Sequence, residues 1–141
     1  MFKAKRLDGK WVTGDFVKGK KRCYIIHCWD DGSEQDCMQF IEVDSLTVCR
    51  SVDIPNELGE TVYEHDVFLQ ETDDKFSGVV YWIVKYGHYN DSRRHGFYLE
   101  KMGYGEIYSD FDILKNCRSL GSIHDNPVLV PRKFSKGVYN E

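Results

Sequence analysis

The polar segment from residue 87 to residue 96 holds the densest group of side chains that could do chemistry. Between its two terminal glycines it contains His88, Asp91, Arg93, Arg94 and His95. Imidazoles exchange protons near neutral pH, and guanidinium groups bind phosphate or carboxylate oxygens. The composition is equally typical of a solvated loop. We therefore predict a long loop, in which Arg93 and Arg94 are candidates to contact an anion or a nucleic acid; whether it forms a ligand site stays open.

A second cationic group surrounds Gly19 and consists of Lys18, Lys20, Lys21 and Arg22. Glycine inside a polar run favours a turn, so we interpret this run as a solvated hairpin tip. Lys20, Lys21 and Arg22 are the candidate nucleic-acid contacts under the alternative interpretation. The net charge of -4 and the pI near 5.7 argue against binding of nucleic acid through overall charge.

Five cysteines raise the question of a metal site, since Cys23, Cys28 and Cys37 stand near His27. Structural zinc sites usually contain a Cys-x2-Cys pair, which this chain lacks. In a strand, Cys23 and Cys28 would point to opposite faces and could not share one ion. We interpret the cysteines as small apolar fillers of a β core and predict neither a metal nor a cofactor.

Glu64, His65 and Asp66 form a further polar group beside an expected strand. Two carboxylates flanking an imidazole could tune its pKa, but on an extended chain Glu64 and Asp66 would share one side and His65 would face away. An acidic side chain that bonds the backbone at the strand entry is the simpler interpretation. The chain contains no HExxH, no phosphate-binding Gly-rich loop and no nucleophile elbow, so we predict no catalytic residues and no enzyme.

The bulk composition is that of one ordinary globular domain. The 141 residues are 41% hydrophobic and 30% charged. No run approaches the roughly 20 apolar residues that span a bilayer, and no apolar segment follows the first six residues. We therefore expect no membrane association and a place in the reducing cytoplasm, where an odd number of cysteines would remain thiols.

The pattern of β-branched and aromatic residues predicts a mainly β fold with little helix, a single multi-stranded antiparallel sheet or barrel-like domain. Strands are expected at 2–6, 11–17, 22–29, 38–43, 46–49, 61–63, 66–69, 78–86, 97–99 and 120–123, with a connector at 51–59 and a polar loop at 71–77. The run 78–86 is apolar enough to be covered on both faces. One helical turn is expected at 109–115, capped by Ser109.

Aromatic residues make up 14% of the chain and gather in the strongest predicted strands. A base-stacking platform is one possible use of such residues. Because they coincide with the strands, we interpret them as core or as a subunit interface. They include Tyr81, Trp82, Tyr86, Tyr89, Phe97 and Tyr98.

Two segments resemble one family. Residues 59–67, GETVYEHDV, look like the "G-x-x-I-Y-E-G-D-I/V" element of YopX-like proteins of phages and prophages, and residues 120–129, LGSIHDNPVL, are similar to their "I-G-N-I-Y-E-N-P-E-L-L" ending. The opening FKAK and the GVV at 78–80 match in order and spacing. The family pattern has glycine at the position of His65, and its "T-G-L-x-D" lead-in is absent here. The resemblance covers residues 1–130 and implies a mainly β, oligomeric phage-type protein; residues 131–141 are predicted to be a flexible basic tail.

These observations lead to one expected function and one alternative. We expect a non-enzymatic accessory protein of a phage or prophage in the host cytoplasm, which associates with itself through aromatic β surfaces and could also bind a host or phage protein. The alternative is a nucleic-acid-binding β module. It would use Lys20, Lys21, Arg22, Arg93, Arg94 and the basic tail against exposed aromatics.

Overall fold

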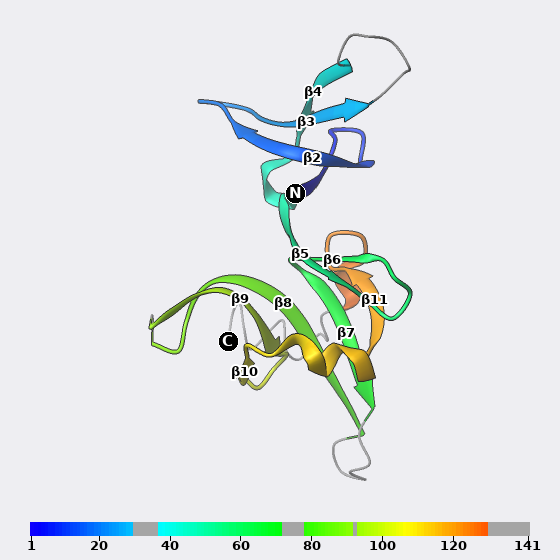
Figure 1. Cartoon of the computed structure of the whole chain (residues 1–141), viewed down its shortest axis with the longest axis vertical. Helices are drawn as coiled ribbons and strands as arrows, with labels where there is room; N and C mark the ends of the chain where they lie inside the picture. The colour runs from blue at the N-terminus through cyan, green and yellow to red at the C-terminus, as the bar shows by residue number, and fades with distance from the viewer. Residues whose placement is uncertain (30–36, 72–77, 92, 130–141) are drawn as a thin grey trace. The chain divides into compact units, whose positions relative to one another are not determined.

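A computed structural model describes residues 1–29, 37–71, 78–91 and 93–129 of the chain (Figure 1). These residues divide into two compact units, one covering Met1–Ser51 and the other beginning at Val52. The sequence was interpreted as one domain from residue 1 to residue 130. Most of the polar loop at 71–77 and the basic tail at 131–141 lie outside the described residues.

The prediction of a mainly β fold is confirmed. Eleven strands are present among the described residues: β1 (Phe2–Lys5), β2 (Trp11–Lys18), β3 (Cys23–Trp29), β4 (Cys37–Val43), β5 (Cys49–Pro55), β6 (Thr61–Tyr63), β7 (Asp66–Glu71), β8 (Val79–Tyr89), β9 (Arg94–Lys101), β10 (Ile107–Tyr108) and β11 (Arg118–Ser122). They form two sheets, of order β4-β3-β2-β1-β5-β6 and β10-β9-β8-β7-β11. Both sheets have two end strands, so the described strands do not close into a barrel.

The first unit is built from consecutive hairpins. β1 pairs with β2 through a turn in which the amides of Arg6 and Gly9 bond to the carbonyls of Lys10 and Arg6. β2 then pairs with β3, and β3 with β4, all antiparallel. Inward-facing side chains of these strands form one small core, made of Ala4, Val12, Cys23, Ile25 and Val43. The strands expected at 2–6, 11–17, 22–29 and 38–43 are thus present.

Gly14 in β2 allows a close approach between two backbones. A Cβ atom at this position would lie 2.0 Å from the carbonyl oxygen of Ile26 in β3. That distance is far inside van der Waals contact, and the obstacle is backbone, which cannot rotate away as a side chain does. Residue 14 must therefore be glycine for β2 and β3 to keep their present separation.

The second unit is organised around β8, the middle strand of the five-stranded sheet. Trp82, Ile83 and Val84 are consecutive and all buried. Trp82 and Val84 belong to a core with Phe68 and Leu99, whereas Ile83 packs with Val67 and Met102 in a separate cluster. Since successive residues of a strand point to opposite faces, this strand is covered on both faces, as the apolar run at 78–86 predicts.

Two expectations about the connections are wrong. Ser51–Gly59 does not form one connector, because β5 continues to Pro55 and only then does Asn56 close a turn with Glu60 and Gly59. Pro55 is tolerated as the last residue of a strand, where a missing amide donor disrupts no further pairing. The segment at 46–49 is likewise not a strand, since Ser45–Thr47 forms a 3-10 turn, η1, before β5 begins.

Helical structure in the described residues is limited to three short 3-10 helices, η1, η2 (Phe111–Asn116) and η3 (Pro127–Leu129). The helical turn expected at 109–115 is present as η2, but Asp110 caps it in place of Ser109: its carboxylate accepts a hydrogen bond from the amide of Asp112 at 2.9 Å. None of these described helices is long and apolar enough to cross a bilayer.

Replacing Gly14 by alanine should destabilise the first unit by about 1–3 kcal/mol, because the new methyl group overlaps the Ile26 carbonyl. The free energy of unfolding, measured in urea, tests this. Thr13→Ala, at the exposed neighbouring position of the same strand, serves as the control and should cost less than about 1 kcal/mol. Equal stability of Gly14→Ala and the wild type would contradict the close approach.

Candidate functional site

The segment 87–96 is the tip of a hairpin and not a long loop, which corrects the sequence prediction. β8 extends to Tyr89, β9 begins at Arg94, and Tyr89 pairs with Arg94. The turn between them is closed by the Arg93 amide, which donates to the Asn90 carbonyl at 3.1 Å. Asn90 and Asp91 both have positive φ, 54° and 57°, as tight hairpin turns require. Figure 1 shows β8 and β9 as a long, curved hairpin.

Arg93 and Arg94 are brought together at this tip. Both are exposed, and they line a shallow, mainly polar hollow with Asn90 and Asp91. Guanidinium groups in such a position can form charge-assisted hydrogen bonds to phosphate or carboxylate oxygens without a large desolvation cost. The tip can therefore contact an anion, although Asp91 offsets part of its positive charge.

A ladder of rings leads from the core to the tip on one face of the hairpin. Tyr86 lies opposite Phe97 with ring centroids 4.9 Å apart, and His88 lies opposite His95 at 4.5 Å. Tyr86 also contacts His95 edge-on at 5.0 Å. Phe97 and Tyr86 are half-buried and the two histidines are exposed, so the ladder is part core and part accessible surface. Trp82, by contrast, is buried core.

Lys20, Lys21 and Arg22 occupy the turn between β2 and β3, as predicted. The Gly19 amide donates to the Arg22 carbonyl at 2.8 Å, and all three cationic side chains are exposed. The Arg22 guanidinium lies 3.6 Å from the Glu42 carboxylate of β4. These residues belong to the first unit, whereas Arg93 and Arg94 belong to the second. Their role in nucleic-acid binding stays a prediction.

The Glu64-His65-Asp66 group forms a tight turn between β6 and β7. Asp66 Oδ2 accepts a hydrogen bond from the Tyr63 amide at 3.0 Å, which confirms the expectation of an acidic side chain bonded to backbone at a strand entry. His65 is not extended: its φ is 70°. A residue with a Cβ atom pays roughly 1–2 kcal/mol for the left-handed conformation, so histidine at this position is strained relative to glycine.

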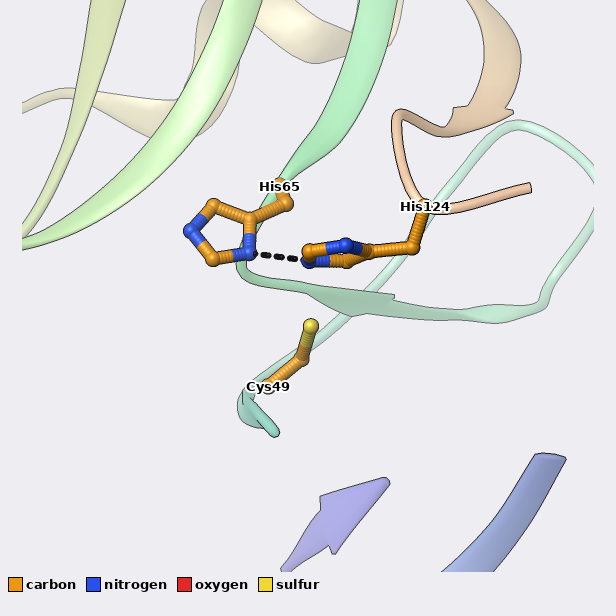
Figure 2. A group of neighbouring side chains, drawn as sticks. All are labelled: Cys49, His65 and His124. Carbon is orange, nitrogen blue, oxygen red and sulfur yellow. Dashed lines mark hydrogen bonds between the residues drawn. The ribbon is translucent and has the colours of Figure 1, made fainter. Parts of the chain in front are cut away.

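His65 meets a second histidine that the sequence did not single out. His65 Nδ1 lies 2.8 Å from His124 Nε2, with the rings edge to face and their centroids 4.8 Å apart (Figure 2). Both imidazoles are half-buried. One of them donates and the other accepts, so at least one of the facing nitrogens carries a lone pair. The two residues are separated by 59 positions, and no spacing rule links them.

The pKa of His65 is lowered from its ordinary value, first by burial and then by the positive charge of Lys85. Both causes disfavour the imidazolium form. His65 is therefore neutral at neutral pH, which leaves one ring nitrogen able to accept a proton or bind a metal ion.

Three cysteines in the described residues, Cys23, Cys49 and Cys117, are buried thiols, in agreement with their interpretation as core fillers. Cys49, drawn in Figure 2, belongs to the first unit and donates to the Thr47 carbonyl oxygen at 3.3 Å. Cys117 donates to the Ile113 carbonyl oxygen at the same distance. Cys28 lies in β3, as does Cys23.

Cys117 should react very slowly with iodoacetamide in the native protein. Burial, and then the Glu57 carboxylate, raise the pKa of the Cys117 thiol to about 11. Because only the thiolate attacks, about one molecule in a thousand would be reactive at pH 8. Mass spectrometry of peptides labelled between pH 7 and pH 10 tests this, and labelling should rise with pH across the whole range.

Glu57→Gln should lower the pKa of Cys117 and speed the labelling, while a glutamine oxygen can still accept the hydrogen bond that Glu57 Oε1 receives from the Ser119 amide. Protein unfolded in urea supplies the control rate. Native labelling at pH 8 as fast as in urea would contradict the raised pKa.

Comparison with models of known protein families gave no match, and no curated protein sequence is similar to this chain. The assignment of a function therefore depends on the residues and the geometry described above.

Proposed function

We propose that this protein is a non-enzymatic interaction module that associates with a second copy of itself through strand β4. The observation that carries the proposal is the exposed apolar end strand of the six-stranded sheet. β4 is the last strand in the order β4-β3-β2-β1-β5-β6, and its Met38 and Phe40 side chains are 58% and 57% exposed.

End strands normally avoid pairing by carrying charges, proline or a bulge. From Met38 to Ile41, β4 has none of these, and its register with β3 is regular throughout. Val43, its last residue, forms a bridge with Arg6, but the outer backbone groups before Val43 face away from β3 and can form an antiparallel ladder with β4 of another copy. A twofold axis would then place the same strand on both sides of the interface.

The neighbouring strand widens the apolar surface. Phe40 lies opposite Ile26, and Tyr24 of the same strand lies opposite Val17 of β2. Alternation places these four side chains on one face of the sheet, and Val17, Tyr24 and Ile26 are half-buried. The end strand and this face together could bury Phe40 fully in an assembly, which supports a hydrophobic interface centred on it.

Several polar side chains of the described residues stabilise turns and caps. Asp44 and Asp110 cap the 3-10 helices η1 and η2, and Asn56 closes the turn after β5. Each of these side chains accepts hydrogen bonds from the local backbone and thus stabilises the fold.

We propose that a phage or prophage encodes this module and that it acts in the cytoplasm of the host cell. Supporting this, the two segments that resemble YopX-like proteins lie together in the second unit. Ser122 of β11 pairs with Asp66 of β7, and the Ile123 amide donates to the His65 carbonyl. The buried thiols Cys23 and Cys117 suit a reducing compartment.

Self-association predicts a dimer or larger assembly in size-exclusion chromatography with light scattering, and Phe40→Glu should raise its dissociation constant at least about a hundredfold. Each lost phenylalanine contributes about 1.5–3 kcal/mol, and a twofold interface loses two. Leu58→Glu changes a 73% exposed side chain in the second unit and should leave the assembly intact. A monomer mass for the wild type at every concentration would overturn the proposal.

A second candidate function is binding of single-stranded nucleic acid by the β8–β9 hairpin. The observation that favours it is the pair of exposed guanidinium groups at the tip, next to the accessible end of the ring ladder. Cations would contact phosphates, and His88 and His95 could stack on bases.

The double change Arg93→Ala and Arg94→Ala should weaken binding to a single-stranded oligonucleotide at low salt. It should also reduce the slope of log K against log salt by about 1.4, because two phosphate contacts are lost. Lys115→Ala with Arg118→Ala removes the same charge from other exposed positions and is the control. Absence of wild-type binding at low ionic strength, or equal slopes for both variants, would exclude this function.

A further inference from the structure

We propose that His65 and His124 together bind a divalent transition-metal ion such as Zn²⁺ or Co²⁺, through His65 Nδ1 and His124 Nε2. The two atoms are 2.8 Å apart and face one another directly (Figure 2). Two imidazole nitrogens that bind one zinc ion at 2.0–2.1 Å in tetrahedral geometry lie roughly 3.3 Å apart. If the two nitrogens moved about 0.5 Å further apart, the ion could therefore take the place of the hydrogen bond.

The backbone holds both ligands in place without the metal. The His65 amide donates to the Val84 carbonyl at 2.8 Å, and the His65 carbonyl accepts from the Ile123 amide at 3.1 Å. The His124 amide donates to the hydroxyl oxygen of Ser122, which is 2% exposed. Binding would thus require little ordering of the chain, since β7, β8 and β11 already fix the two residues.

The hydrogen bond between the two rings requires one facing nitrogen to accept, and a nitrogen with a lone pair is the form of imidazole that coordinates metals. Lys85, the cation near His65, is paired with Glu100, so its charge is partly balanced. Because both rings are half-buried, each is partly accessible to solvent.

The backbone at His65 indicates that histidine serves more than packing there. The residue has a φ of 70°, a conformation that glycine adopts without strain. Strained backbone residues cluster at functional sites, and this one places its ring against a second histidine. His88 and His95 also lie together, but both are exposed and no strained backbone positions them.

Zn²⁺ titration of the metal-free full chain, followed by isothermal calorimetry and thermal unfolding, tests the proposal. The wild type should bind one Zn²⁺ per chain and unfold at a higher temperature with it. His65→Gly and His124→Gln should each weaken Zn²⁺ binding by more than the 10–100-fold typical for loss of an outer partner of a metal ligand. His65→Gly relieves the positive φ, so circular dichroism should show that this variant folds.

His88→Gln with His95→Gln is the matched control, because it removes the other pair of adjacent histidines and should leave the tight site unchanged. The absorption spectrum of Co²⁺ reports the ligand types. A spectrum with nitrogen ligands that disappears in His65→Gly supports the site, and a thiolate-to-cobalt band lost in the same variant supports it with a cysteine as a further ligand.

Two outcomes would overturn the proposal: no Zn²⁺-dependent change in the wild type, or Zn²⁺ binding that is lost in the His88/His95 variant and kept in His65→Gly. Repeating the titration on Phe40→Glu separates metal binding from self-association, so failure of one proposal does not decide the other.

Discussion

The burial of β8 on both of its faces is the constraint on which the second unit depends. A strand with Trp82, Ile83 and Val84 buried in succession needs a layer of side chains on each side, and the two clusters around Phe68 and around Val67 supply these layers. The single polar atom of the Trp82 ring is satisfied, because its Nε1–H donates to Gln70 Oε1 at 2.9 Å. This central strand can therefore stay in one register.

The features that could act chemically extend from that strand. The backbone carbonyl of Val84 accepts the hydrogen bond that fixes His65, and the same strand continues outward to Tyr89 and the hairpin tip. The histidine pair is thus hydrogen-bonded to the inner part of β8, and the arginine pair follows its outer end.

Much of the strand content could be predicted from the sequence, because β-branched and aromatic runs such as 79–84 have few other stable arrangements. The prediction is wrong where a segment with the composition of a loop forms part of a strand. A polar segment bounded by glycines is typical of a loop, yet residues 87–89 pair with residues 94–96, since the backbone hydrogen bonds of an exposed hairpin do not require apolar side chains. Pro55 similarly suggested a connector and instead ends a strand.

The histidine pair could not be predicted for a different reason. The prediction assumes that His65 lies on an extended chain, but its backbone is left-handed, so the alternation of faces does not apply to it. His124 comes from a turn after β11, and the pairing of β7 with β11 that brings it near is a long-range contact. No sequence motif links His65 to His124, although each of them lies in one of the two segments that resemble the same family.

The hairpin contains one cross-strand pair that has no side chains at all. Gly87 lies opposite Gly96, between the ring pairs Tyr86–Phe97 and His88–His95, and a Cβ atom at either position would meet nothing within 4 Å. Because side chains alternate along a strand, this pair faces the side opposite the ring ladder, where neither residue has a side chain to pack. At that point the two strands are connected by their backbone and by the rings of Tyr86 and His95 on the other face, and the face of the glycines is left open.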